Sequence, residues 1–352
     1  MQALDVPEQH DTLHGVKPPV ETAALFGHNT QTAHIAQAYR QRRLHHALLL
    51  EGPQGIGKAS FAFQLAQHLI ANPQASGAPE SFTLLDRNNN DFRQLALGSH
   101  NQVLHLTRPF DPKTEKFKTM LTVDEVRRIG HFLSRTNPGA GYRTVIIDPV
   151  NDMNANASNA LLKNLEEPPA RTLFILIAHT SGRVLPTIRS RCQRVAFSAL
   201  DDTDLASALA EASGSAVPSD EMARLAALAE GSVRRALLLR QFGGMEVTET
   251  ADALIAANVL DVEKAGKLGD VLTAREAEIQ YQLLTDHLLQ KMAKAAERHS
   301  AGGDAGRAEA MASSFAETRT MLAQAQGFNL DRKQTVFGLI ADLQGKTRAG
   351  LM

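Results

Sequence analysis

The stretch GPQGIGKAS, residues 52–60, decides how the rest of the chain is interpreted. It follows the pattern G-x-x-x-x-G-K-[ST] of a phosphate-binding loop at Gly52, Gly57 and Lys58. The next position of the pattern carries a serine or threonine hydroxyl, and here it holds Ala59. The stretch therefore predicts a nucleotide-type fold whose chemistry has been altered.

The glycines and the lysine of this loop suit phosphate groups. Glycines such as Gly55 let backbone N–H groups turn inward at the start of a helix, where the helix dipole favours anions. The Lys58 ammonium supplies a point charge for β- and γ-phosphates. The missing hydroxyl is the group that binds Mg²⁺ in active phosphate-loop enzymes. Ser60 lies one position later and about 100° further round a helix, so it is a poor replacement.

Short apolar runs alternate with helical patterns through the first half of the chain. The predicted buried strands are HALLLEG (46–52), QVLHLTR (102–108), RTVIID (143–148), TLFILIAH (172–179) and QRVAF (193–197). The predicted helices cover 58–70, 122–135 and 156–169, and the second begins with Thr122 and Glu125 at capping-box spacing. Continuous apolar strands separated by helices imply a parallel sheet covered on both faces.

The second half of the chain has a different pattern of apolar residues. After about residue 200 the strand patterns end, and alanine- and leucine-rich helical periodicity continues to the C-terminus. The pair Gly243–Gly244 is typical of a linker. We therefore expect an α/β domain over 1–198, a small helical domain over 199–244 and a second helical domain over 245–352.

Composition excludes several classes of protein. The 352 residues carry 37 Lys and Arg against 38 Asp and Glu, which argues against gripping DNA through a strongly basic face. One cysteine excludes an internal disulfide and a cysteine-based zinc finger. The N-terminal stretch lacks an apolar signal core and no apolar run approaches about 20 residues, so we expect no membrane span and a cytoplasmic protein.

The second catalytic element of a phosphate-loop enzyme is an acidic pair after a buried strand. Asp148 ends the strand in VIIDPVND (145–152) and is placed to bind Mg²⁺ directly or through water, although such an aspartate also serves as a helix cap. The next position, where a glutamate would orient the attacking water, is Pro149, and Asp152 lies four residues beyond Asp148. The losses at 59 and 149 leave phosphate binding open and predict that hydrolysis is lost.

Several motifs together resemble the clamp-loader subunits of the AAA+ superfamily. These are NALLKNLEEPP (159–169), TLFILIAHTSGRVLPTIRSRCQRVAF (172–197) and, within it, the triplet Ser190-Arg191-Cys192, which is the hallmark of that family. The stretches LFGHNTQT (25–32), LHHALLLEGPQGIGKAS (44–60) and LTVDEVRRIGHFLS (121–134) resemble subunits of the bacterial delta-prime type. The resemblance covers residues 22–242, and beyond them only the helical texture is similar.

The resemblance implies a fold and a set of site residues. The implied fold is an AAA+ phosphate-loop domain over 1–198, a helical lid over 199–244 and a C-terminal helical collar that assembles subunits over 245–352. Arg191 matches the arginine finger, which acts in trans on the ATP site of a neighbouring subunit. Arg189 and Arg194 flank it and are open to confusion with it.

Three further positions match functional positions of the family. Thr180 follows the third strong strand, near the residue that senses the γ-phosphate, and Arg234 in GSVRRAL (231–237) matches the second sensor on the lid. With an altered loop, Arg234 has either a sensor role or a structural one. Lys163 in the predicted helix of residues 156–169 is a candidate charge near DNA, although an exposed lysine is the commoner explanation.

One feature departs from many relatives. They carry a four-cysteine zinc module between the phosphate-loop helix and the second strand, whereas residues 71–101 contain no cysteine. His100 and Asp91 are too few to build a structural zinc site. We therefore expect no metal and a loop, partly disordered, in this stretch.

The resemblance implies a binding and assembly subunit. It would help to open the sliding clamp and place it on primed DNA as part of the DNA polymerase III holoenzyme, with ATP bound without hydrolysis. Its partners would be motor subunits of the gamma/tau type and a delta-type subunit, with the clamp and primed DNA engaged through the complex. Two alternatives remain: an ATP-hydrolysing motor subunit of the same loader, and another AAA+ DNA-remodelling ATPase.

Overall fold

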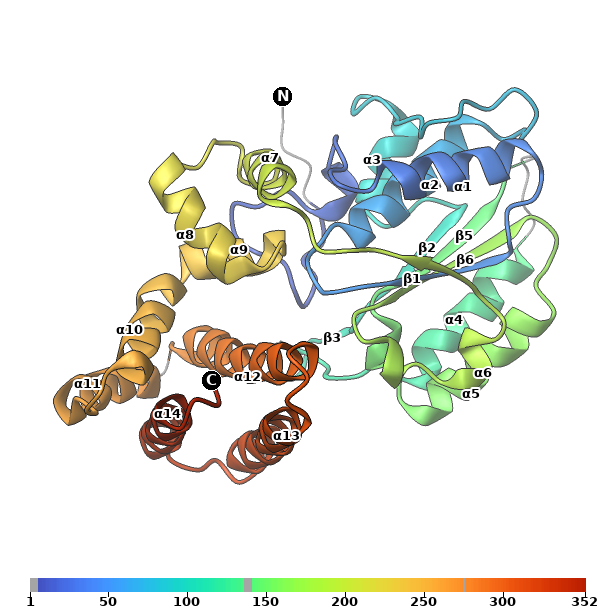
Figure 1. The fold of residues 1–352 in the computed structure, drawn as a ribbon. Helices are drawn as coiled ribbons and strands as arrows, with labels where there is room; N and C mark the ends of the chain where they lie inside the picture. The colour runs from blue at the N-terminus through green and yellow to red at the C-terminus, as the bar shows by residue number, and fades with distance from the viewer. Residues whose placement is uncertain (1–5, 136–140, 275) are drawn as a thin grey trace. The chain divides into compact units, whose positions relative to one another are not determined.

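The computed structural model of the chain describes residues 6–135, 141–274 and 276–352 (Figure 1). These residues form two compact units, which are described separately. The N-terminal unit comprises Met1–Pro218 with Glu230–Arg234, and the C-terminal unit comprises Ser219–Ala229 with Arg235–Met352. The predicted division into three domains stays a prediction.

A parallel sheet forms the centre of the N-terminal unit. Its strands are β1 (Ala47–Glu51), β2 (Val103–Leu106), β5 (Arg143–Ile147), β6 (Thr172–Ala178) and β7 (Gln193–Ala196). They lie in the order β2-β5-β6-β1-β7, and every neighbouring pair is parallel. All five predicted strands are confirmed. The register sets Leu49 and Ile147 on either side of Leu176, so the carboxyl ends of β1, β5 and β6 meet at one edge.

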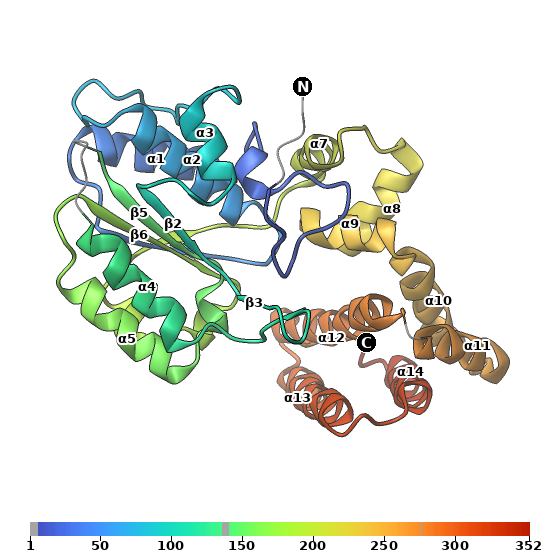
Figure 2. The same ribbon diagram turned by 180° about the vertical axis from the view of Figure 1, so that it is seen from behind.

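Alternating strand residues bury the two faces of this sheet. One face packs against α1 (Asn29–Arg40), α2 (Lys58–Ala71) and α3 (Asn90–Ala96), and the other packs against α4 (Val123–Ser134), α5 (Ala155–Glu166) and α6 (Pro186–Arg189), as both ribbon views show (Figures 1 and 2). Leu48 and Ile175 point to the first set, whereas Leu49 and Leu176 point to the second. The predicted three-layer α/β arrangement is confirmed.

Three details differ from the sequence-based expectation. The stretch 71–101 is not simply a loop, because it contains α3, whose first turn is capped by the Asn89 side chain accepting from the Asp91 N–H at 2.8 Å. A short hairpin, β3 (Phe110–Asp111) with β4 (Lys116–Phe117), follows β2 and was not expected.

The predicted capping box at the start of α4 is also wrong. Thr122 occupies the N-cap position, but its side chain makes no capping hydrogen bond within the described part of the chain. Glu125 instead accepts a 2.5 Å bond from Arg128, one turn further along the helix. The ion pair thus removes the glutamate that the box requires.

The C-terminal unit is helical, as its sequence texture predicts. Its elements are α8 (Ser219–Ala229), most of α9 (Val233–Gln241), α10 (Gly244–Ala256), α11 (Val262–Thr273), α12 (Glu278–Ala301), α13 (Ala305–Gly327) and α14 (Arg332–Arg348), whereas α7 (Asp202–Ser213) belongs to the N-terminal unit. Leu284, Leu288 and Met292 from α12 form its core with Leu339 and Ile340 from α14. Amphipathic stripes that have no sheet to cover them are buried against one another.

The packing of α5 against the sheet generates a stability prediction. Leu161 is completely buried against the sheet, whereas its neighbour Leu162 is only partly buried. Leu161→Ala should lower the free energy of unfolding of the N-terminal unit by about 2–5 kcal/mol, because it removes buried methyl groups and leaves a cavity. Urea titration followed by circular dichroism measures this loss. Leu162→Ala is the matched control, and an equal loss in both variants would contradict the assigned packing of α5.

Candidate functional site

The predicted phosphate loop forms the turn between β1 and α2. Gly55 and Gly57 have φ values of 78° and 102°, a region that favours glycine, and Gly57 is the N-cap of α2. A Cβ atom on Gly55 would lie 2.4 Å from the Arg234 Cβ and 2.5 Å from the Ser232 Oγ. Ser232 Oγ also donates to the carbonyl of Gln54 at 2.8 Å. Glycine at position 55 is therefore required for residues 232–234 to lie against the loop.

The Lys58 side chain is buried inside its own loop. It is 3% exposed, and its Nζ donates to the carbonyl of Gly52 at 2.7 Å and to the carbonyl of Pro53. Burial lowers the pKa of Lys58 to about 8, and the nearby charge of Asp148 opposes that shift. Two of the three ammonium donors are thus bonded to backbone oxygens of the turn.

The two positions after Lys58 offer no hydroxyl toward the loop. Ala59 packs against the core between the sheet and α2. Ser60 Oγ donates to the Thr22 Oγ1 at 3.3 Å, on a segment that precedes α1. The loop therefore fits phosphate groups through its glycines and its lysine, but its residues do not provide the Mg²⁺ ligand that hydrolysis requires.

Asp148 directly follows β5 at the edge of the sheet where the loop lies. Burial raises the pKa of Asp148 to about 7. The charges of Asp11 and Asp152 act in the same direction, whereas Lys58 and Arg234 oppose them. A metal ion binds the ionised carboxylate, and burial here favours the protonated form.

The segment after Asp148 is held by hydrogen bonds to neighbouring elements. Asp152 Oδ2 lies 2.5 Å from the Arg108 Nε, so its carboxylate is paired. Asn151 joins this segment to the end of β6, because its Nδ2 donates to the Thr180 carbonyl at 2.8 Å and its Oδ1 accepts from the His179 N–H at 2.7 Å. The predicted sensor Thr180 is exposed and lies at this edge.

Arg234 lies against the loop, and an N-terminal segment lies against Arg234. Its backbone N–H donates to the Gly55 carbonyl at 3.3 Å. Its guanidinium donates to the Asp11 carbonyl at 2.5 Å and lies 3.9 Å from the Asp11 carboxylate. Gln9 Nε2 lies 3.4 Å from the Nδ1 of His105, which is within β2, and His10 Nδ1 lies 3.1 Å from the Oγ1 of Thr107, the residue after β2. Residues 9–11 thus lie along the edge of the sheet beside the candidate site.

Buried histidines add neutral groups around the same edge. Burial lowers the pKa of His105 and of His179 to about 4, and the charge of Lys58 adds to the lowering at His179. Burial also lowers the pKa of His10. The side chains that carry charge here are therefore the lysine, arginine and aspartate groups described above.

The arginines around the Ser190-Arg191-Cys192 triplet have different partners. Arg194 Nε lies 2.5 Å from one carboxylate oxygen of Glu51, and Arg189 Nε lies 3.9 Å from the other. Glu51 is the last residue of β1 and is 5% exposed. Removing either arginine would weaken the compensation of a buried charge.

Of these three arginines, Arg191 pairs with an exposed carboxylate rather than with the buried Glu51. Its Nη2 lies 2.7 Å from the Glu166 Oε1 at the end of α5, and its Nη1 donates to the Thr187 carbonyl at 2.8 Å. Its side chain is 35% exposed. The adjacent Cys192 is partly buried, and burial, with the charge of Glu51, raises the pKa of its thiol to about 12. The structure thus separates Arg191 from its two flanking arginines.

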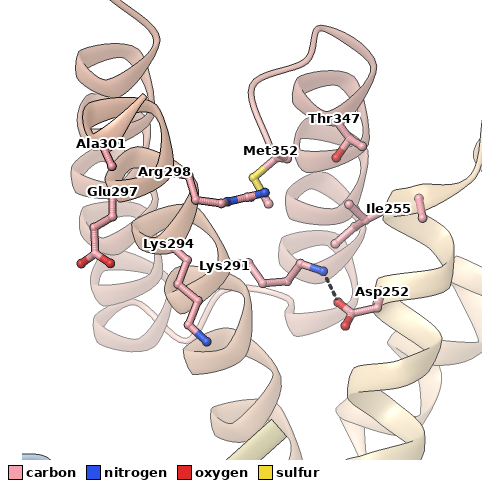
Figure 3. Close-up of a pocket in the computed structure, with 10 residues that line it drawn as sticks. Asp252, Ile255, Lys291, Lys294, Glu297, Arg298, Ala301, Thr347 and Met352 are labelled. Carbon is pink, nitrogen blue, oxygen red and sulfur yellow. Dashed lines mark hydrogen bonds and ion pairs between the residues drawn. The ribbon is translucent and has the colours of Figure 1, made fainter. Parts of the chain in front are cut away.

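The C-terminal unit has a hollow of its own, which contains none of the predicted site residues. It is about 750 Å³ in volume and is lined by Asp252, Ile255, Ala256, Lys291, Lys294, Glu297, Arg298, Ala301, Thr347 and Met352 (Figure 3). Lys291 points to Asp252 and donates to its carboxylate at 2.8 Å. Both basic and acidic side chains line it, and one of each, Lys291 and Asp252, form an ion pair.

The described residues contain no group of three or more His, Cys, Asp or Glu side chains that could hold a metal ion. Among the same residues no helix combines the length and apolarity needed to cross a membrane.

The strand order, the glycine turn after β1 and the helices on both faces define an α/β protein of the phosphate-loop fold class. Comparison with known proteins adds a likeness to one family. The family described as DNA polymerase III, delta subunit, matches residues 27–201, so this segment of the chain is similar to that family.

Individual proteins that are similar to the chain are also DNA polymerase III subunits. The chain is 38% identical to the DNA polymerase III subunit delta' of Pseudomonas aeruginosa over 42% of this chain and 41% of that protein. It is 26% identical to the DNA polymerase III subunit tau of Bacillus subtilis over 80% of this chain and 48% of that protein. The chain thus spans less than two thirds of the length of these relatives.

Among solved structures, the chain is similar to a DNA polymerase III gamma subunit-related protein from Thermotoga maritima. The two share 18% identity over 90% of this chain and 98% of that chain, with a TM-score of 0.35. The fold assignment stands on the strand order of the chain itself.

The raised pKa of Asp148 generates a prediction about pH. An acid whose pKa is about 7 in the fold and 3.8 when unfolded makes the native state less stable as pH rises between those values. Asp148→Asn removes this penalty, so the unfolding free energy of the variant relative to the wild type should rise by on the order of 1–3 kcal/mol between about pH 4 and pH 7. Urea titrations at several pH values measure the difference.

Comparing variant with wild type cancels the opposite contribution of His105 and His179, whose lowered pKa values stabilise the fold as pH rises. Asp202→Asn, at an exposed position in the first turn of α7, is the control. A pH-independent difference for Asp148→Asn would show that this carboxyl is ionised throughout the range.

Proposed function

We propose that the chain is a delta-prime-type clamp-loader subunit of the bacterial replicative DNA polymerase III holoenzyme, acting in the cytoplasm. It helps to open the sliding clamp and load it onto primed DNA, and it supplies Arg191 to the ATP site of a neighbouring motor subunit. The observation that carries the proposal is a contrast within the N-terminal unit. Lys58 of the chain's own loop is bonded inside that loop, whereas Arg191 lies on the surface with its guanidinium partly exposed.

The nucleotide site supports binding better than hydrolysis. Gly52, Gly55, Gly57 and Lys58 would hold the phosphates of ATP, and Arg234 would contact the terminal one. Lys58 and Arg234 would have to exchange their present carbonyl partners for phosphate oxygens, which lowers affinity. Bound ATP would then serve as a structural ligand, because the hydroxyl that holds Mg²⁺ and the carboxylate that orients water are both missing.

Arginine suits the role proposed for position 191. A guanidinium is always charged, presents five donors in a planar fork and stabilises the charge that spreads over a transferring phosphoryl group. The loop that carries Arg191 is fixed by a short helix, α6, and by the bond from Arg191 to the Thr187 carbonyl. The surrounding arginines cannot take over this role, because they compensate the buried Glu51.

The second candidate is an ATP-hydrolysing motor subunit of the same loader. The match to a tau subunit over 80% of this chain favours it, since that stretch exceeds the match to the delta' relative. Ala59 and Pro149 argue against it, and so do the contacts of the two nearest replacements, because Ser60 is bonded to Thr22 and Asp152 is paired with Arg108. The third candidate is another AAA+ DNA-remodelling ATPase. It also requires the hydroxyl that is absent at position 59 and the carboxylate that is absent at position 149.

The partners follow from the same proposal. They are motor subunits of the gamma/tau type and a delta-type subunit, with the sliding clamp and primed DNA engaged through the assembly. The C-terminal unit is the proposed collar. It exposes large apolar side chains at the turns next to α11 and after α13, namely Val259, Val262, Phe328 and Leu330, with exposed fractions of 79%, 64%, 76% and 54%. Such side chains are suited to burial against neighbouring subunits.

The altered loop generates a prediction about hydrolysis. The purified chain should show no ATP turnover, with or without clamp and primed DNA, because Ala59 and Pro149 replace two groups that hydrolysis needs. Phosphate release measured with excess ATP tests this. Lys58→Ala, shown to be folded by circular dichroism, is the comparison. Repeated turnover by the wild type that disappears in this variant would support the motor subunit instead.

The finger assignment is tested in reconstituted complexes. Arg191→Ala should leave folding and assembly intact and reduce clamp- and primed-DNA-dependent ATP turnover, because arginine fingers contribute on the order of 10³–10⁵ in rate at the site they serve. The loss in the whole complex should be smaller, since other motor sites have their own fingers. Arg191→Lys should restore little, because an ammonium lacks the planar fork.

The control for this experiment must remove a positive charge without exposing Glu51. Arg127→Ala meets that condition, because Arg127 is exposed on α4 and pairs only with Asp124 one turn away among the described residues. Arg189→Ala and Arg194→Ala would instead disturb the buried carboxylate. Equal turnover for Arg191→Ala and wild type in verified complexes would remove the finger assignment.

A further inference from the structure

The Arg191 guanidinium has a carboxylate partner whose position is unusual. Glu166 is the last residue of α5, and its Oε1 lies 2.7 Å from the Arg191 Nη2. The C-terminus of a helix carries partial negative charge, so a glutamate there is unfavourable for the helix itself. The ion pair with Arg191 compensates the repulsion between the Glu166 carboxylate and the negative end of the helix dipole. A glutamate at this position is therefore explained by its pairing with Arg191 rather than by helix formation.

The remaining contacts of Arg191 hold its side chain in one orientation. The Nη1 donates to the Thr187 carbonyl at 2.8 Å and lies 3.3 Å from the Ser190 Oγ. These bonds come from the loop that carries the arginine, whereas the Nη2 bond comes from α5, far away in the sequence. The guanidinium can therefore lose its Glu166 partner and still be oriented by its own loop.

We infer that Glu166 is a positioning residue, which holds the Arg191 guanidinium in an intramolecular ion pair until phosphate oxygens of a neighbouring subunit's nucleotide replace its carboxylate. The inference rests on the proposed function of Arg191. Carboxylate and phosphate oxygens are recognised by the same N–H fork of arginine, so the two anions compete for the Nη2 donor. Glu166 thus makes engagement of the finger depend on displacing a partner from this chain.

The pair is weak enough to be displaced. The two side chains are 35% and 48% exposed, and ion pairs of that kind shift an equilibrium by only about two- to fivefold. The charge of a triphosphate exceeds that of one carboxylate, so exchange favours the nucleotide when the neighbour is correctly placed. A more deeply buried pair would hold the arginine permanently.

The experiment uses the full chain in reconstituted clamp-loader complexes. Glu166→Gln should raise kcat/KM for clamp- and primed-DNA-dependent ATP turnover about two- to fivefold at low salt, because it removes the competing carboxylate. The difference should disappear at high salt, where the pair is already screened. Turnover over a range of ATP concentrations, at low and high salt, measures both effects.

Two further variants identify the cause of the change. Glu167→Gln removes the same charge from the adjacent exposed position and should behave as the wild type. In an Arg191→Ala background, Glu166→Gln should have no effect, because the group that it positions is absent. Melting temperatures of the isolated chains show whether a variant has lost stability.

The outcomes separate the inference from the proposal on which it rests. If Arg191→Ala lowers turnover while Glu166→Gln matches the wild type, or acts equally in the Arg191→Ala background, the role of Glu166 is wrong and the finger stands. If Arg191→Ala leaves turnover unchanged, the finger itself falls, and the inference falls with it.

Discussion

Two hydrogen bonds from the Lys58 ammonium to carbonyls of its own turn hold the centre of the N-terminal unit. A buried cation needs polar partners, and the turn between β1 and α2 supplies them only while its glycines keep their left-handed conformation. That conformation in turn lets Arg234 and Ser232 lie against Gly55. The positions of β1, α2 and residues 230–234 therefore all depend on the backbone conformation of this loop. The loop thus has a structural role that does not involve hydrolysis.

The same edge of the sheet shows how an altered active site remains folded. Asp148, which a phosphate-loop enzyme would keep ionised beside Mg²⁺, has its pKa raised to about 7 by burial. Asp152 is paired with Arg108, and Asn151 bonds the end of β6. Asp152 and Asn151 are thus bonded within the chain, whereas the buried His105 Nε2 and His179 Nδ1 have no hydrogen-bond partner among the described residues.

Much of the sheet was predictable from the sequence, for a local reason. Strands β1, β5 and β6 are buried on both faces, so their apolar residues run without interruption and leave little choice of structure. The glycine positions of the loop were equally clear, because few other residues adopt its backbone angles. Helix α3 was not predicted, and its first turn is stabilised by the Asn89 cap. The capping box predicted at Thr122 does not form, because Glu125 pairs with Arg128 instead.

The rest of the site depends on contacts that no sequence window contains. Arg234 donates a hydrogen bond to the carbonyl of Asp11, which lies 223 residues earlier in the sequence. The N-terminal segment contains no motif that would have predicted this contact. The three arginines at positions 189, 191 and 194 look alike in the sequence, and only the burial of Glu51 distinguishes them. The resemblance to a family selected position 191, and the geometry adds the reason why its neighbours are unsuited to the same role.

The partly buried Cys192 thiol has a practical consequence for labelling. With a pKa of about 12, its thiolate fraction at neutral pH is on the order of 10⁻⁵, and maleimide or disulfide reagents attack the thiolate. A second cysteine placed on an exposed turn would therefore react selectively while the native one stays in place. Fluorescent dyes or spin labels can then report distances in an assembled loader without any change to the residue beside Arg191.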